Sequence, residues 1–491
     1  MGLDVVITGA NRGIGLGFTQ EYLSRGNRVI ATYRSKDSLD RLIEVHPGKF
    51  TSLQELQIKY PERLKLQPLD VTSEEDVARF ATSVEKLDLL ILNAGIKGYS
   101  VPGTKTKDHP PGDLRAALEV NTLAANHIWS CFFPLISKTP NAGVIFMGSL
   151  VGLPKDNASG NYHPYRVSKT ASHHMMWNLF IHLTQEWRQQ TVEALKEDPS
   201  LCSLKERVRT ILPDSSDLDQ SLEIIERALM ATPLMPQLKH PPLGASQTAA
   251  FKEWLDSVFP DVPLKTPLSE KILKNLIQHP WSPKTTGREW ILEVLEKTCL
   301  IDALREPIEK ALTSPSSIET LYKRHFEASR QDLAELQKAG PIREPILKED
   351  VEEWVKSSVS QISFLSEELK DRLIEVMKDS PCLRELREKM MRILSESPFA
   401  AAVCAGWVRT DMGGPHARLS IEMSTGYMAD VIEILRKTKQ ANGLLMYDGT
   451  MAEKYPASTE LEEIFYAIKH RSTPSSQPSE SSSSSCTSSS T

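Results

Sequence analysis

Hydrophobic and polar positions follow two different patterns along this chain of 491 residues. Toward both ends, short apolar runs alternate with amphipathic stretches, which predicts strands alternating with helices in a parallel, doubly wound α/β sheet. The predicted strands are residues 5–8, 28–32, 65–69, 87–92, 143–147 and 400–404, with a helix near 424–439 and a last strand at 443–447.

Between residues 187 and 396 the pattern becomes helical almost throughout and is interrupted by proline. This block contains three of the chain's 24 glycines, and glycine-poor, charge-dense sequence favours helices. We therefore predict an α/β domain made of residues 1–186 and 397–470, with an all-helical insertion at 187–396. The Ser-rich residues 471–491 are predicted to be a disordered tail.

Two parts of the helical block resemble each other at a constant offset of 182 residues. Residues 183–212 match 365–394 at Pro199 and Pro381, at Leu201 and Leu383, and at several Glu, Lys and Leu positions. A duplicated helix–proline–helix unit is one interpretation. Chance is the other, because Lys, Glu and Leu are abundant in any amphipathic helix.

Charge and composition exclude several classes of function. The net charge of −6 provides no basic field for nucleic acid, and no apolar run approaches the roughly 20 residues of a membrane helix. The chain enters its first strand at once, which leaves no room for a signal peptide. Six scattered cysteines show neither C-x-x-C pairs nor metal-ligand spacing. We therefore expect a reduced, cytoplasmic protein.

A glycine-rich turn follows the first predicted strand and opens a helix. Its residues are Thr8, Gly9, Ala10, Asn11, Arg12, Gly13, Ile14 and Gly15. Glycines there let the backbone approach a pyrophosphate, which the helix N-terminus then stabilises. A glycine cluster alone can be a plain turn, but the order of strand, glycines and helix favours a dinucleotide site.

Tyr165 and Lys169 are four residues apart, so a helix would place both side chains on one face. A phenol has a pKa near 10 and is a poor proton donor or acceptor at neutral pH. An ammonium about 4 Å away, at a dielectric near 20, is worth about 4 kcal/mol or roughly three pKa units. The pair is therefore predicted to bring the pKa of Tyr165 toward neutrality. Ser149 comes at the end of a predicted strand.

Together with three more segments, these residues resemble the short-chain dehydrogenase/reductase family. The spacing of Gly9, Gly13 and Gly15 is that family's variant, and the other segments are Leu69-Asp70-Val71, Asn93-Ala94-Gly95 and the Gly-Trp-Val-Arg-Thr-Asp-Met-Gly of residues 406–413. The resemblance covers residues 1–186 and 398–469. Residues 406–413 and the short C-terminal stretch resemble C-signal-like and carbonyl-reductase-like members in particular. The resemblance implies a Rossmann fold and an oxidoreductase that reduces a ketone or aldehyde with NADP(H).

The resemblance also implies roles for individual residues. Tyr165 would donate the proton, Lys169 would hold the nicotinamide ribose, and Ser149 would bind the carbonyl oxygen, while Asn121 would hold a relay water. The implied cofactor-binding residues are Thr8, Gly9, Asn11, Arg12, Gly13, Ile14, Gly15, Arg34, Asp70, Val71, Asn93, Ala94, Gly95, Tyr165, Lys169, Gly406, Val408 and Thr410. No metal is expected, because His163, His173 and His174 lack ligand partners at suitable spacing.

The second predicted strand indicates which cofactor is preferred. An acid about 20 residues after the glycines would bind a ribose 2′-hydroxyl, whereas an arginine suits a 2′-phosphate. The strand ends at Arg34 without an acid, and Arg12 lies inside the glycine turn. Asp37 is a rival acid but comes three residues too late.

One departure from the family is Ala405, where proline is usual. The start of the loop at residues 406–413 is therefore predicted to be less rigid.

The helical block enters between a helix and a strand, so it should lie at the amino edge of the sheet, away from the chemistry at the carboxyl edge. This block could bind a protein partner or join subunits in a homodimer. The ligand expected for the α/β domain, besides the cofactor, is a small carbonyl substrate. An alternative function is a redox-sensing scaffold that binds the cofactor and acts through this block. The presence of Asn121, Ser149, Tyr165 and Lys169 together favours the enzyme.

Overall fold

A computed structural model describes the α/β domain and the base of the helical block. The described residues are 2–37, 52–98, 110–154, 157, 160–195, 197–211, 355–356, 359, 366–378, 381–414, 417, 419–438, 443–446 and 451–454. Most of the predicted insertion and the predicted disordered tail lie outside these residues, and both remain predictions.

Within the described residues, eight strands form one sheet in the order β3-β2-β1-β4-β5-β6-β7-β8. The strands are β1 (Asp4–Ile7), β2 (Arg28–Tyr33), β3 (Leu64–Pro68), β4 (Leu89–Leu92), β5 (Gly143–Gly148), β6 (Phe399–Cys404), β7 (Gly443–Met446) and β8 (Met451–Lys454). The first seven run parallel, and β8 pairs antiparallel with β7. The predicted doubly wound sheet is confirmed.

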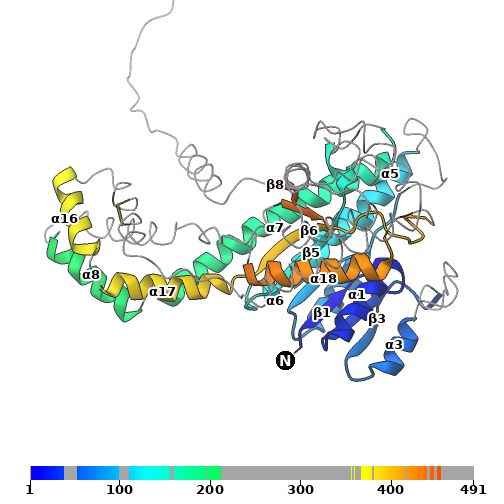
Figure 1. Ribbon diagram of the computed structural model, residues 1–491, viewed down its shortest axis with the longest axis horizontal. Helices are drawn as coiled ribbons and strands as arrows, with labels where there is room; N and C mark the ends of the chain where they lie inside the picture. The colour runs from blue at the N-terminus through cyan, green and yellow to red at the C-terminus, as the bar shows by residue number, and fades with distance from the viewer. Residues whose placement is uncertain are drawn as a thin grey trace, which may run out of the picture.

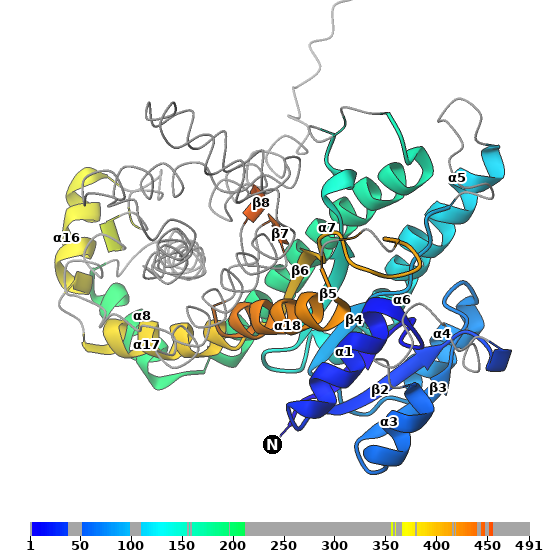
Figure 2. The ribbon, with the colours of Figure 1, turned by 45° about the vertical axis from the view of Figure 1, so that its right-hand side comes forward.

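Helices cover both faces of the sheet (Figure 1). On one face, α1 (Gly13–Ser24) packs against α18 (Ile421–Thr438), and Figure 2 shows the two side by side. On the other, α4 (Glu74–Thr82) contacts α6 (Ala124–Ile136), and α5 (Pro111–Leu118) contacts α7 (His163–Leu195). The short α3 (Leu53–Lys59) packs on β3 and begins with a capping box formed by Ser52 and Glu55.

The central strands are buried on both faces, which explains their continuous apolar sequences. Every residue of β4, β5 and β6 is buried, as expected for parallel strands covered by helices on both sides. The core therefore lies along the middle of the sheet and holds the carboxyl ends of these strands in fixed positions.

The observed strands follow the predicted ones within a few residues, with one error at the end of the sheet. Residues 443–447 were expected to form the last strand, but β8 follows β7 and closes the edge antiparallel. The register of this pair is irregular between Leu444 and Leu445. Apolar alternation over four residues is too short to separate such an edge strand from a loop.

Helix α7 has 33 residues, or about 50 Å at 1.5 Å per residue, so it extends well past the sheet. Beyond the amino edge it packs against α17 (Pro381–Ser395), which leads back into β6. Trp187 Nε1 donates a hydrogen bond of 2.9 Å to the Ile393 carbonyl. The predicted boundary at residue 187 thus falls inside a continuous helix, at a point where the entering and leaving chains are in contact.

In the described part of the chain, four helical segments form an arm on this side, distant from α5 (Figure 1). They are the end of α7, α8 (Pro199–Ile211), α16 (Glu367–Lys378) and α17. In both of the similar segments a helix begins at the matching proline, and the matching residues Leu201 and Leu383 are both buried. The end of α7 and α8 form one copy, and α16 and α17 form the other. The first helix of each copy contacts the second helix of the other, since α7 contacts α17 and α16 contacts α8. This arrangement favours duplication over chance.

Candidate active site

The glycine-rich turn lies at the carboxyl end of β1 and leads into α1. Gly9 has a φ of +63°, a conformation that favours glycine. A Cβ on Gly15 would lie 2.4 Å from the Gly9 carbonyl oxygen and 2.5 Å from Asn93 Nδ2, so only glycine allows this close packing. Arg12 is the N-cap of α1 and makes no side-chain cap, which leaves first-turn N–H groups for an anion. The turn therefore fits a dinucleotide pyrophosphate.

The end of β4 is joined to the glycine-rich turn by hydrogen bonds. Asn93 Nδ2 donates to the Thr8 carbonyl at 2.9 Å and to the Gly9 carbonyl at 3.0 Å. The Thr8 hydroxyl accepts from the backbone N–H groups of Asn93 and Ala94. These predicted cofactor residues come together in space, and their polar groups fix the turn's shape.

The remaining predicted residues of the nucleotide side lie at neighbouring strand ends. Arg34 follows β2 and is exposed. Asp70 follows β3, where its carboxylate accepts hydrogen bonds from the backbone and the hydroxyl of Thr72. The Leu69 N–H donates to the Tyr33 carbonyl, so the ends of β2 and β3 are held together. Val71 packs partly buried against the core.

Residues 406–413 form a compact loop at the carboxyl end of β6. Gly406 has a φ of +74°, and Trp407 Nε1 donates to the Gly413 carbonyl at 2.8 Å. The Thr410 hydroxyl accepts from the Gly413 N–H, and Val408 is buried. Ala405, which replaces the usual proline, accepts a hydrogen bond of 2.8 Å from the buried Ser424 hydroxyl of α18. That bond joins the start of the loop to α18.

Ser149, Tyr165 and Lys169 converge at the carboxyl end of β5. Ser149 comes directly after β5, while Tyr165 and Lys169 lie on the first turns of α7. The Ser149 side chain hydrogen-bonds the Tyr165 hydroxyl. Lys169 is 5% exposed, with Nζ 5.6 Å from the Tyr165 ring centroid and donating to the Met147 carbonyl at 2.8 Å. The predicted pair therefore shares one helical face.

Asn121 occupies a π-helical turn, Glu119–Leu123, between α5 and α6, and such turns often occur at functional sites. Its side chain exchanges hydrogen bonds of 2.8 Å with the backbone of Ile96 and donates to Ser168 Oγ at 2.9 Å. Its carbonyl accepts from the Ser172 hydroxyl. In this structure Asn121 therefore joins the loop after β4 to α7, which positions the helix that carries Tyr165.

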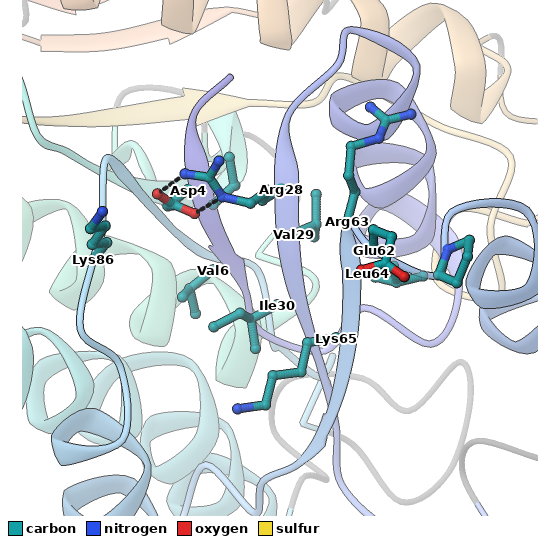
Figure 3. A pocket seen from close by; sticks show the side chains of 12 residues that line it. Asp4, Val6, Arg28, Val29, Ile30, Glu62, Arg63, Leu64, Lys65 and Lys86 are labelled. Atoms are coloured by element: carbon teal, nitrogen blue, oxygen red, sulfur yellow. Dashed lines mark hydrogen bonds and ion pairs between the residues drawn. The ribbon is translucent and has the colours of Figure 1, made fainter. Parts of the chain in front are cut away.

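A small pocket lies at the opposite, amino end of the strands (Figure 3). It has a volume of about 210 Å³ and includes Asp4 and Arg28, which form an ion pair, together with Lys65 and Lys86. None of the predicted site residues lines it. It is also smaller than the roughly 300 Å³ at which ligand pockets begin, so the candidate site remains at the carboxyl edge.

Comparisons with known proteins agree with this geometry. The family model described as short chain dehydrogenase matches residues 4–196. A short-chain dehydrogenase of Pyricularia oryzae is 32% identical over 194 residues, covering 37% of this chain and 71% of the relative. The chain belongs to the short-chain dehydrogenase family. An uncharacterised oxidoreductase of Schizosaccharomyces pombe is 33% identical over 187 residues, covering 37% of this chain and 67% of its own length.

Two solved structures complete the comparison. A short chain dehydrogenase from Burkholderia cenocepacia in complex with NADP is 27% identical, covers 38% of this chain and 68% of its own, and has a TM-score of 0.30. An NADPH-bound carbonyl reductase from chicken fatty liver is 16% identical, covers 92% of this chain and 98% of its own, and has a TM-score of 0.41. Family membership rests on the sequence relatives and makes the chain an oxidoreductase of a family that uses nicotinamide cofactors.

In this short-chain dehydrogenase, burial decides the protonation of the candidate pair. Burial, and then proximity to Cys404, raises the pKa of Tyr165 above its ordinary value, although the Ser149 hydrogen bond opposes the shift. Burial lowers the pKa of Lys169 to about 8. The predicted lowering of the pKa of Tyr165 is therefore wrong here, because desolvation of the buried phenol is the largest effect on it. The phenol stays protonated at neutral pH.

His173 is the buried residue whose contribution the sequence did not reveal. Its Nε2 accepts a hydrogen bond of 3.1 Å from the Ser149 N–H, so it supports the backbone that presents Ser149. Burial, together with the nearby Lys169, lowers the pKa of His173 to about 4. The spacing of four residues between Lys169 and His173 is the one signal that could have placed both on the same face.

Stability should fall in acid because of His173. The unfolded histidine binds a proton near pH 6.5 and the folded one near pH 4, so the unfolded state takes up protons first as pH falls. We expect about 2 kcal/mol of unfolding free energy to be lost between pH 7.5 and 5. His173→Gln, which can still accept the Ser149 hydrogen bond, should remove most of this loss in denaturant titrations.

The exposed neighbour provides the matched control for that titration. His174 lies next to His173 but faces solvent, so His174→Gln should keep the wild-type pH dependence. An equal flattening of the pH profile in both variants would contradict a buried, neutral His173.

Neither a metal-binding cluster nor a membrane-spanning helix is present in the described residues. No group of three or more His, Cys, Asp or Glu side chains there could hold a metal ion. None of the helices in those parts of the chain is long and apolar enough to cross a membrane.

Proposed function

We propose that the chain is an NADP(H)-dependent reductase that converts a ketone or aldehyde into an alcohol. The observation that carries the proposal is the protonated Tyr165 hydroxyl beside Ser149, above the buried Lys169, at the strand ends that also carry the glycine-rich turn. The bound cofactor would supply the hydride.

The chain's own residues would handle the proton and the oxygen. Tyr165 donates its hydroxyl proton to the carbonyl oxygen as the hydride arrives, and the phenol is in the protonated form that this step requires. Ser149 hydrogen-bonds the same oxygen and stabilises the charge that develops on it. Lys169 lies beneath the phenol and assists reprotonation. His173 and Asn121 hold Ser149 and α7 in place.

A carbonyl panel tests the proposed reaction. NADPH oxidation followed at 340 nm over aldehydes and ketones of increasing size should reveal turnover with at least one of them. The alternative is a cofactor-binding redox sensor that acts through the helical arm. The observation in its favour is that α7, which carries Tyr165 and Lys169, continues beyond the sheet into this arm. Tight NADPH binding without turnover of any carbonyl would support the sensor and contradict the reductase.

The cofactor preference gives a separate prediction. Arg34 is exposed at the end of β2, at the position where an acid would serve NAD(H). Arg12, in the glycine-rich turn, is the second basic residue that we assign to the 2′-phosphate. We expect NADPH to bind more tightly than NADH and Arg34→Ala to narrow the difference by about 1–3 kcal/mol, the scale of a charged hydrogen bond. Fluorescence titrations with NADPH and with NADH measure this difference in binding free energy.

Lys36 offers a matched control, because it is also exposed and basic but lies two residues beyond Arg34. Lys36→Ala should leave the ratio of the two dissociation constants nearly unchanged. A wild-type preference for NADH would overturn the cofactor assignment.

A further inference from the structure

Arg12 and Asp411 form an ion pair that joins the two loops of the cofactor site. Arg12 lies in the glycine-rich turn and Asp411 in the loop after β6, and 399 residues separate them. The side chains are 49% and 38% exposed, so solvent and ligands can reach both. Beside the pair, a Cβ on Gly13 would lie 3.5 Å from Thr410 Cγ2. The loops therefore meet at this point.

Asp411 has one ionic partner within the described part of the chain. Its carboxylate contacts Arg12 Nη1, and the other basic groups of that part lie beyond ion-pair distance. The same guanidinium is a ligand of the 2′-phosphate in the function proposed above. A phosphate carries more charge than a carboxylate and binds a guanidinium through two parallel hydrogen bonds. Asp411 already holds Nη1, so a phosphate that binds through both terminal nitrogens has to compete with Asp411 for that group.

We propose that Asp411 and the 2′-phosphate of NADP(H) compete for Arg12. Asp411 lowers the affinity for NADP(H) and not for NAD(H), which lacks the competing phosphate. Binding of the 2′-phosphate frees the loop of residues 406–413 from the glycine-rich turn. Asp411 is thus a specificity-determining residue, and the inference rests on the proposed role of Arg12.

The pair can be removed without a large effect on folding. Ion pairs between half-exposed side chains contribute little to stability, and Asp411→Asn keeps the size and polarity of the side chain. Thermal unfolding of the full-length variant should match the wild type. A change in cofactor affinity can then be attributed to Arg12 rather than to the fold.

The test is a double-mutant cycle on the full-length chain, with dissociation constants for NADPH and NADH at low ionic strength. Asp411→Asn should tighten NADPH binding about 3- to 10-fold and change NADH binding less than about twofold. In an Arg12→Gln background, Asp411→Asn should no longer tighten NADPH binding. Glu422→Gln, which removes an exposed charge at the start of α18, should leave both constants unchanged.

Three outcomes would overturn the competition: no tightening by Asp411→Asn, equal tightening of NADH, or tightening that persists without Arg12. Failure of the proposed function is distinguishable from these, because Arg12→Gln alone would then leave NADPH affinity unchanged. If Arg12→Gln weakens NADPH binding but Asp411→Asn has no effect, Arg12 is a ligand and only the competition is wrong.

Discussion

Replacement of Tyr165 by phenylalanine is expected to lower kcat for carbonyl reduction by about two to four orders of magnitude, the usual contribution of a positioned proton donor. The substitution removes one hydroxyl and keeps the ring that lies over Lys169. Cofactor affinity should change little, because the glycine-rich turn and the strand ends are untouched. Steady-state assays and NADPH titrations on the same preparation measure both effects.

Tyr22 supplies the matched control for this loss of a hydroxyl. Its side chain is buried on α1, and its hydroxyl has no hydrogen-bond partner among the described residues. Tyr22→Phe should therefore retain full activity and at least the wild-type stability, because an unpartnered buried hydroxyl costs free energy. Turnover by Tyr165→Phe within tenfold of wild type would rule out Tyr165 as the proton donor.

The sheet could be predicted from sequence because its strands are buried on both faces and read as continuous apolar runs. Residues 89–92 and 143–147 are such runs, separated by amphipathic helices of ordinary length. The edge strand β8 was missed, since Met451–Lys454 pairs on one side with β7 and carries no apolar pattern. Most of the helical insertion predicted from composition lies outside the described residues, so its bounds and its independence as a domain stay predictions.

The candidate site could be predicted where its chemistry lies in short consecutive motifs. The glycine-rich turn, Ser149 and the Tyr165–Lys169 pair are of this kind. Contacts between distant segments could not be predicted from one sequence. Examples are the hydrogen bond from Ser149 to His173 and the ion pair between Arg12 and Asp411. The protonation of Tyr165 was misjudged because burial, which depends on the whole fold, cannot be read from a spacing of four residues.

Lys169 connects activity with stability, because burial of its ammonium group costs folding free energy. The folded pKa of about 8 lies below the ordinary 10.5, so the unfolded chain holds the proton more tightly between these values. The unfolding free energy of the wild type should therefore rise by about 2 kcal/mol between pH 7 and 10 relative to a variant without this group. At pH 7 Lys169 is still mostly protonated, so the free-energy cost of burying its charge is still largely present.

Lys169→Met is expected to lower kcat about 100-fold or more, the scale of losing one electrostatic contact to the reacting groups, and to raise the unfolding free energy at pH 7 by about 2 kcal/mol. The variant gains stability because no ammonium group has to be desolvated on folding. The gain is partly offset because the hydrogen bond from Lys169 Nζ to the Met147 carbonyl is lost. Lys86→Met, at an exposed position, should change neither quantity. Activity is measured by NADPH oxidation and stability by denaturant titration from pH 7 to 10. A variant that loses activity and stability together would show that Lys169 supports the fold as a paired cation, whereas opposite changes indicate a buried charge that is retained for catalysis.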